Sequence, residues 1–87
     1  METMRALVYD RPSVCSVRDV PMPVCGEDEV VIKVMAASIC KGADRRHHTT
    51  GHKLGRYPIT TGHEFAGYIY QVGSAVTGWN VGDRVTA

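Results

Sequence analysis

Residues 62–76 read GHEFAGYIYQVGSAV, and this stretch decides the fold more than any other part of the sequence. Its central run, Glu64–Val72, is predicted to be a β-strand, because β-branched and aromatic residues favour the pleated, half-buried surface of a sheet. His63 stands where this strand begins. Gly62 and Gly67 are predicted to lie where a Cβ would crowd the approach of the backbone to a site built around that histidine.

Hydrophobic residues alternate with period two in three further segments, residues 5–9, 14–20 and 29–36, which we predict to be strands. In the third segment Val30, Ile32, Val34 and Ala36 are expected to face one way. A last strand opens at Asp83. Turns rich in proline, glycine, serine and aspartate separate the segments. The sequence therefore predicts a mainly β fold.

Residues 39–57 break this pattern, because they are polar and show no period-two alternation. A short helix is predicted over residues 41–48, followed by a loop through Gly51 and Gly55. Loops and excursions on a rigid sheet often carry function. We therefore look for the functional site at the two ends of this segment.

Cys40 stands at the first end, directly after an apolar strand, and His63 stands where the chain returns to a strand. Zinc accepts both cysteine sulfur and histidine nitrogen, so the two side chains form a zinc-like pair. On spacing alone, a buried thiol and an incidental histidine explain these two residues better. Other parts of the sequence change that balance.

Size and composition narrow the class of protein. The chain has 87 residues, room for one domain with a thin core, and its formal net charge of +1 gives no case for nucleic acid or an anionic membrane as partner. No apolar run approaches the roughly 20 residues of a membrane helix, and no signal-peptide core is present. Three cysteines exclude a complete disulfide framework, which favours the cytoplasm. Because residues 85–87 lie within a predicted strand, we expect a fragment.

The residues around His63 resemble the signature of zinc-dependent medium-chain alcohol and polyol (sorbitol-type) dehydrogenases, which has Gly-His-Glu, a glycine three residues later and another six residues after that. Further blocks resemble the same family in the same order: MRALV at 4–8, DEVVIKV at 28–34, AASIC at 36–40 and VGDRV at 81–85. The resemblance implies a GroES-like β-barrel, incomplete, with one short helix after Cys40. Residues 1–87 would be the N-terminal portion of the catalytic domain, with the Rossmann domain absent.

The resemblance also implies a site. Cys40 and His63 would ligate the catalytic zinc, and Glu64 would hydrogen-bond beside the metal or ligate it when a water leaves. Asp44 would hold the other ring nitrogen of His63, although a helix-start charge is an alternative reading of Asp44. NAD or NADP would be bound mainly by a domain outside this chain, since no Gly-x-Gly-x-x-Gly occurs here and no cofactor-binding residue is assigned.

The match departs from the family after Cys40, where the run is CKGADRRH over residues 40–47. One extra residue separates Cys40 from Asp44, and Ala43 carries no hydroxyl to relay the substrate proton. His47, a candidate catalytic relay, is displaced by one position; Thr49 and Thr50 are alternatives. The cations Arg45, Arg46 and Lys53 are expected to form a solvated charged face rather than a phosphate contact.

We therefore expect the parent enzyme to oxidise an alcohol or polyol to a carbonyl with hydride transfer to NAD(P), and to act as a homo-oligomer on a small molecule. The isolated chain is expected to be inactive, because it lacks a third ligand and the cofactor domain. Two rivals stay open: a GroES-like binding or interaction module without catalysis, and a zinc-free quinone reductase relative. The sequence does not fix the substrate, the choice of NAD or NADP, or the residue that relays the proton.

Overall fold

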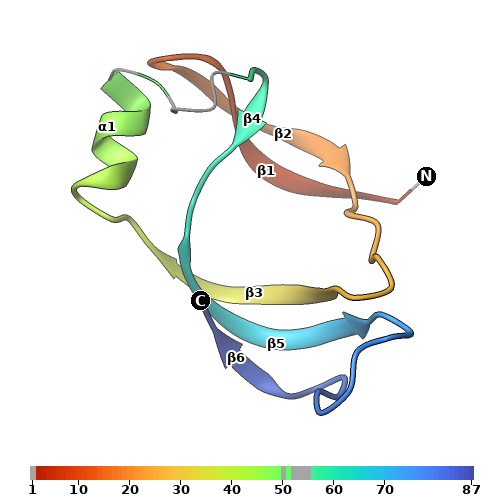
Figure 1. Cartoon of the computed structure of the whole chain (residues 1–87). Helices are drawn as coiled ribbons and strands as arrows, with labels where there is room; N and C mark the ends of the chain where they lie inside the picture. The colour runs from red at the N-terminus through yellow and green to blue at the C-terminus, as the bar shows by residue number, and fades with distance from the viewer. Residues whose placement is uncertain (1, 50, 52–55) are drawn as a thin grey trace. The chain divides into compact units, whose positions relative to one another are not determined.

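The computed structural model describes residues 2–49, 51 and 56–87, apart from the side chain of residue 47. Six strands and one helix follow one another within this described part of the chain (Figure 1). In order they are β1 (Thr3–Arg11), β2 (Val14–Pro21), β3 (Val30–Ser38), α1 (Ala43–Thr49), β4 (Ile59–Thr60), β5 (Glu64–Val72) and β6 (Arg84–Thr86). The predicted mainly β fold with one short helix is confirmed.

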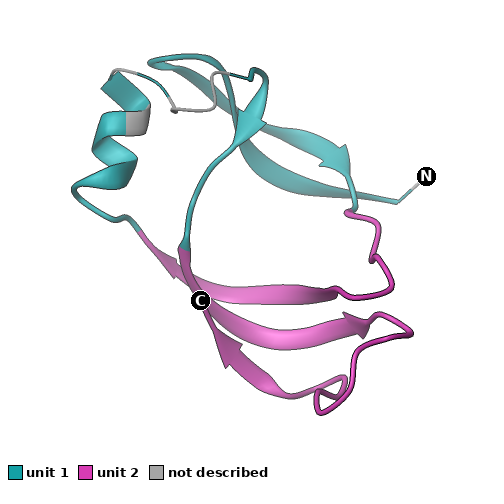
Figure 2. Ribbon diagram, viewed as in Figure 1, with its two compact units in different colours: residues 1–22, 39–63 teal, residues 23–38, 64–87 magenta. Residues whose placement is uncertain are grey.

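These elements divide into two compact units, coloured separately in Figure 2. The first unit consists of Met1–Met22 and Ile39–His63, and the second of Pro23–Ser38 and Glu64–Ala87. Each unit is built on its own antiparallel three-stranded sheet.

The sheet of the first unit has the strand order β2-β1-β4. β1 and β2 form a hairpin whose register runs from Thr3 opposite Pro21 to Tyr9 opposite Cys15. The short strand β4 pairs with β1 at Val8 and Tyr9, and the sequence did not predict it. Val8 and Tyr9 are 5% and 8% exposed and form the buried centre of this unit.

The sheet of the second unit has the order β3-β5-β6. Ile69 on β5 is its most buried side chain among the described residues, at 1% exposed. The register of β3 against β5 shifts twice, between Val31 and Ile32 and between Val34 and Ala36. The second shift adds a residue to β3, so that Val34 and Ala36 stand opposite the consecutive residues Gly67 and Ala66 of β5. The expectation that Val34 and Ala36 face the same way was therefore wrong, and Val34 is 50% exposed.

The end of the described chain is paired to β5. Ala87 and Phe65 exchange backbone hydrogen bonds of 3.0 and 3.3 Å just beyond the last residue of β6. The strand predicted to open at Asp83 is thus present, one residue later than expected. None of the helices in the described part of the chain is long and apolar enough to span a membrane.

Candidate metal centre

The candidate site is built around the start of α1. The first helical backbone bond runs from the amide of Asp44 to the carbonyl of Cys40 at 2.9 Å, so the turn that leads into α1 begins at the cysteine itself. The predicted helix over residues 41–48 is confirmed, with the observed bounds Ala43–Thr49. The backbone at Cys40 is consequently fixed by the helix that follows it.

The far end of α1 is tied to the hairpin of β1 and β2. The Tyr9 hydroxyl lies 2.8 Å from Nδ1 of His48, and the two rings meet edge to face with centroids 5.7 Å apart. Ser13 donates a hydrogen bond of 2.9 Å to the carbonyl of His48. These contacts hold the helix against the sheet of the first unit.

Sequence reasoning missed the anchoring roles of Tyr9, Ser13 and His48. Tyr9 and His48 are separated by 39 positions, and no local pattern links them. Burial raises the pKa of Tyr9 above its usual value of 10.0, and the neighbouring Cys15 and the charge of Asp44 raise it further. Tyr9 therefore remains a neutral phenol, which can hydrogen-bond to His48 as donor or as acceptor.

Asp44 links the helix to both candidate ligands. Its Oδ2 accepts a hydrogen bond of 2.8 Å from the backbone amide of Cys40, in the manner of an acidic residue that reaches back to the start of its own helix. Its Oδ1 lies 3.6 Å from Nδ1 of His63. The side chain is only 16% exposed. The helix-start reading and the histidine-holding reading of Asp44 are therefore compatible.

The Asp44 Oδ1 atom is buried and has no hydrogen-bond partner among the residues that the structure describes. A distance of 3.6 Å to His63 Nδ1 is an ion-pair separation, too long for a hydrogen bond. Leaving a buried carboxylate oxygen without a donor costs about 1–3 kcal/mol or more. A small rotation of the His63 ring toward Asp44 would satisfy this oxygen.

Cys40 and His63 come together in the first unit. The Cys40 sulfur and a ring nitrogen of His63 lie within 4.8 Å of each other. Two such ligands on one tetrahedral zinc stand about 3.6 Å apart, given zinc–sulfur and zinc–nitrogen bonds of about 2.3 and 2.1 Å. The donor pair therefore fits zinc after a small side-chain adjustment, and the carboxylate behind His63 is the usual partner of a metal-bound imidazole.

Glu64 follows His63 directly in the chain and is the first residue of β5 in the second unit. Its Oε1 accepts a hydrogen bond of 2.9 Å from the hydroxyl of Ser38. These two residues are also the last backbone pair of the β3–β5 ladder. The end of that ladder therefore orients the Glu64 carboxylate.

The other predicted site residues divide into two groups. His47 lies on α1, but its side chain falls outside the described part of the structure, as do Thr50 and Lys53. Thr49 donates its hydroxyl hydrogen to the carbonyl of Arg45 at 3.0 Å. Its hydroxyl is therefore already engaged within the helix.

The expectation that a Cβ would crowd the backbone was wrong for Gly62, whereas at Gly67 the close approach is present but involves β3 and not the site. No atom lies within 4 Å of the position that a Cβ on Gly62 would take; instead its φ of +113° lies in a region that favours glycine. A Cβ on Gly67 would overlap the carbonyl oxygen of Lys33 on β3. Gly67 is thus required by close strand packing and not by the site.

Known proteins resemble this chain in both sequence and structure. A family model described as alcohol dehydrogenase GroES-like domain matches residues 26–87. The sorbitol dehydrogenase of Bacillus subtilis is 42% identical over 88 aligned residues, which cover 97% of this chain and 24% of that protein. The zinc-type alcohol dehydrogenase-like protein YdjL of Escherichia coli, itself uncharacterized, is 48% identical over 69 residues, or 79% of this chain and 19% of that protein. The cobalt- and zinc-bound thermostable alcohol dehydrogenase of Pyrobaculum aerophilum superposes with a TM-score of 0.88 at 30% identity, covering 98% of this chain and 26% of that chain.

The strands, the helix after Cys40 and the cysteine–histidine pair define a partial GroES-like fold of the zinc-type dehydrogenase class. The family model covers most of the sequence, and the curated relatives share well over a third of their aligned residues with it. The chain belongs to the alcohol dehydrogenase GroES-like domain family, as its resemblance to zinc-dependent medium-chain dehydrogenases predicted. It spans 19% and 24% of the lengths of the two curated relatives.

Proposed function

We propose that this chain is the metal-holding part of a zinc-dependent dehydrogenase that oxidises an alcohol or polyol to a carbonyl with hydride transfer to NAD or NADP. The observation that carries the proposal is the Cys40–His63 pair, whose ligand atoms lie within 4.8 Å of each other beside the carboxylate of Asp44. Relatives named sorbitol dehydrogenase and alcohol dehydrogenase support the substrate class.

In this proposal Cys40 and His63 hold the zinc. A zinc ion held by these two residues would supply a Lewis acid that polarises the alcohol oxygen and lowers the pKa of the substrate hydroxyl. Once the His63 ring turns toward Asp44, Oδ1 would accept a hydrogen bond from Nδ1–H, so that Nε2 would be the nitrogen left for the metal. The same carboxylate holds the Cys40 amide at 2.8 Å and thereby fixes the backbone that carries the sulfur.

We also propose roles for Glu64 and His47. Glu64 would hydrogen-bond beside the metal or supply an oxygen to it when a water leaves, and the 2.9 Å bond from Ser38 orients its carboxylate. His47 receives the substrate proton and passes it to solvent. A histidine titrates near neutral pH, which suits a residue that must both gain and lose a proton.

The 87-residue chain alone is proposed to be inactive in hydride transfer. It contains no Gly-x-Gly-x-x-Gly for the cofactor, and it offers two permanent ligands, Cys40 and His63, since Glu64 would ligate only when a water leaves; a catalytic zinc generally has three protein ligands. The parent enzyme is proposed to be a homo-oligomer of the cytoplasm, where Cys15, Cys25 and Cys40 would stay reduced as the free thiols found here.

Zinc stoichiometry tests the proposal directly. The chain is expected to bind one zinc per molecule, and Cys40→Ser or His63→Ala is expected to lower the affinity by at least about 100-fold, because each removes a first ligand of the metal. Cys25→Ser is the matched control, since Cys25 is a free cysteine in the other unit. Cobalt substitution gives a second reading, because a thiolate–cobalt charge-transfer band must disappear in Cys40→Ser and persist in the control.

The same experiment separates the alternative function. A GroES-like interaction module without catalysis has no use for a metal. Equal zinc affinity for the unsubstituted chain and for Cys40→Ser would contradict the dehydrogenase proposal and favour the module.

A further inference from the structure

A shallow hollow, wide open to solvent, lies on one face of α1 and is lined by Lys41, Gly42, Arg45, Arg46 and Thr49. Three of these five residues are cationic and none is acidic. The whole chain has a formal net charge of only +1, so this face concentrates positive charge that the rest of the sequence balances.

Helical spacing explains why these side chains gather. Lys41, Arg45 and Thr49 are four residues apart, and the turn that starts at Cys40 is already helical in its hydrogen bonding, so the three lie on one face. Arg46 and Gly42 form the neighbouring row. Gly42 leaves the hollow open, because nothing lies within 4 Å of the position that a Cβ would take there.

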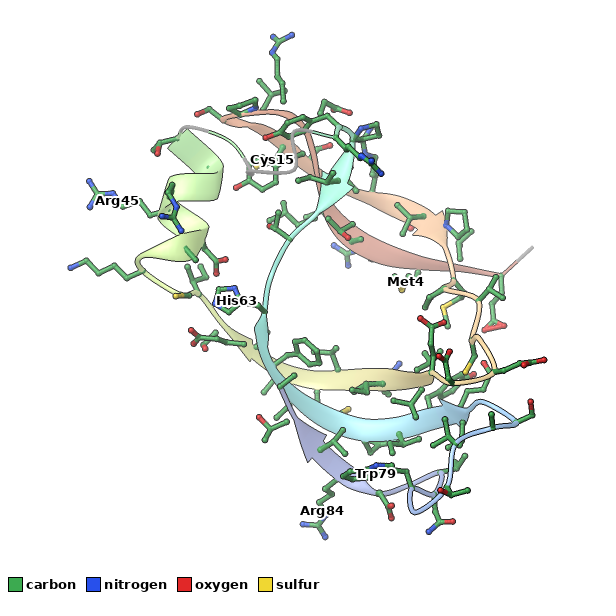
Figure 3. The ribbon with its side chains drawn as sticks, viewed as in Figure 1. Met4, Cys15, Arg45, His63, Trp79 and Arg84 are labelled. Carbon is green, nitrogen blue, oxygen red and sulfur yellow. The ribbon has the colours of Figure 1, made fainter. Side chains whose placement is uncertain are left out.

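Within the first unit, Lys41 and Gly42 follow the candidate ligand Cys40 directly, whereas Arg45 points away from the candidate metal centre (Figure 3). In Figure 3 the side chain of Arg45 extends outward from α1, away from His63. A ligand bound by Arg45 therefore does not need to place its own reacting atom at the Cys40–His63 pair.

The acidic residue of the same helix, Asp44, does not neutralise the charges of Lys41 and Arg45. Asp44 is engaged with the Cys40 amide and lies beside His63, with only 16% of its side chain exposed. Among the residues that the structure describes, neither Lys41 nor Arg45 makes an ion pair, whereas the exposed Arg18 pairs with Asp10 at 2.7 Å.

In place of the purely solvated face expected from the sequence, we propose that this hollow binds a phosphomonoester dianion. An arginine fork donates paired hydrogen bonds to phosphate oxygens, and a lysine adds a point charge. A phosphomonoester carries about −1.5 to −2 charges at neutral pH, whereas a phosphodiester or a carboxylate carries one, so a cluster of cations favours the monoester. The Thr49 hydroxyl lines the hollow but does not donate a hydrogen bond to the phosphate, because it already donates to the Arg45 carbonyl. The phosphate belongs to a phosphorylated small molecule or to the ribose 2′-phosphate of NADP.

Calorimetric titration of the full 87-residue chain, without zinc and at constant ionic strength, tests the proposal. The probes are inorganic phosphate, glycerol 3-phosphate, NADP and NAD. Inorganic phosphate is expected to bind, and Arg45→Gln is expected to weaken it about tenfold through the loss of a charge-assisted contact. Arg84→Gln is the matched control, because Arg84 is an exposed arginine on β6 in the other unit. Glutamine has nearly the helix propensity of arginine, so α1 is kept, which circular dichroism checks.

Two of the outcomes identify the source of the phosphate and both support the site. Arg45-dependent binding of glycerol 3-phosphate assigns it to a small molecule, and Arg45-dependent binding of NADP without glycerol 3-phosphate assigns it to the nucleotide. Equal affinities of Arg45→Gln and Arg84→Gln for phosphate would mean an adventitious ion only and would overturn the proposal. Binding of NAD as tight as that of NADP would overturn it too, because NAD has no monoester. Since the assay contains no metal and no hydride transfer, its result is independent of the zinc proposal.

Discussion

Replacing Asp44 by asparagine separates the charge behind His63 from the shape of the site. Asparagine has the same size and can still accept the hydrogen bond that Oδ2 receives from the Cys40 amide at 2.8 Å. It cannot offer a negative charge to His63 Nδ1, 3.6 Å from Oδ1. Removal of the carboxylate behind a metal-bound histidine typically lowers metal affinity by about 10–100-fold, or about 1.4–2.7 kcal/mol. We expect a loss of zinc affinity in that range for Asp44→Asn.

The stability of the metal-free chain should change less. A hydrogen bond to a charged acceptor contributes about 1.5–3 kcal/mol and one to a neutral acceptor about 0.5–1.5 kcal/mol, so the bond to the Cys40 amide should weaken by about 1 kcal/mol. Relief of the buried oxygen that has no hydrogen-bond partner offsets part of this loss. Asp44→Asn should therefore fold, with its main defect in metal binding.

Competition with a chromophoric chelator measures the zinc affinity, and urea unfolding of the metal-free chain measures the stability. Asp19→Asn is the matched control, because Asp19 is an exposed aspartate on β2, away from α1. Zinc affinity of Asp44→Asn within twofold of that of Asp19→Asn would refute the reasoning that Asp44 acts through His63. A fall in affinity matched by an equal fall in metal-free stability would also refute it, because the effect would then come from unfolding.

Two further predictions concern the fold that supports the site. Since the pKa of Tyr9 is raised in the folded state, the unfolded chain loses this proton first, so the free energy of unfolding should fall as pH rises through and above 10. Tyr9→Phe should flatten that fall in urea titrations between about pH 9 and 11. At neutral pH the same variant should lose about 1 kcal/mol of stability, because the bond to His48 is removed. An unchanged slope in Tyr9→Phe would assign the pH dependence to another group. Gly67→Ala should destabilise the chain by about 2 kcal/mol, or about 10 °C in Tm, because its Cβ would overlap the Lys33 carbonyl. Gly42→Ala is the control in thermal melts, because a Cβ at that position meets open space. Equal melting temperatures of the two variants would contradict the packing argument.

Much of the fold was predictable because local pattern determines it. The strand Glu64–Val72 was predicted with its observed bounds, since a glycine-bounded run of β-branched and aromatic residues carries its own signal. The two-residue strand β4 was not predicted, because it is a strand only through its pairing with β1. The bulge between Val34 and Ala36 was likewise invisible, since the partner strand sets the register and the sequence of β3 shows only alternation.

The candidate site divides in the same way. Cys40, His63 and Asp44 were found from a motif, and the structure places them within reach of one another. Tyr9 and His48, which hold the far end of the helix, were not found, because a contact across 39 positions leaves no trace in either local segment. The residues that the sequence did not reveal hold the helix in place and belong to no recognisable motif.

Because α1 is held by contacts at both ends, hydrogen exchange of its amides reports on whether those contacts are intact. An isolated helix of seven residues does not persist in water, since about 12–15 residues are needed even for favourable sequences. The amides of α1 should therefore exchange with deuterium at a rate set by its two tethers, Asp44 at one end and His48 at the other. A molecule that bound the His48 imidazole in place of Tyr9 would unfold the helix from its C-terminal end. The backbone at Cys40 would then become more mobile, although the molecule makes no contact with the sulfur.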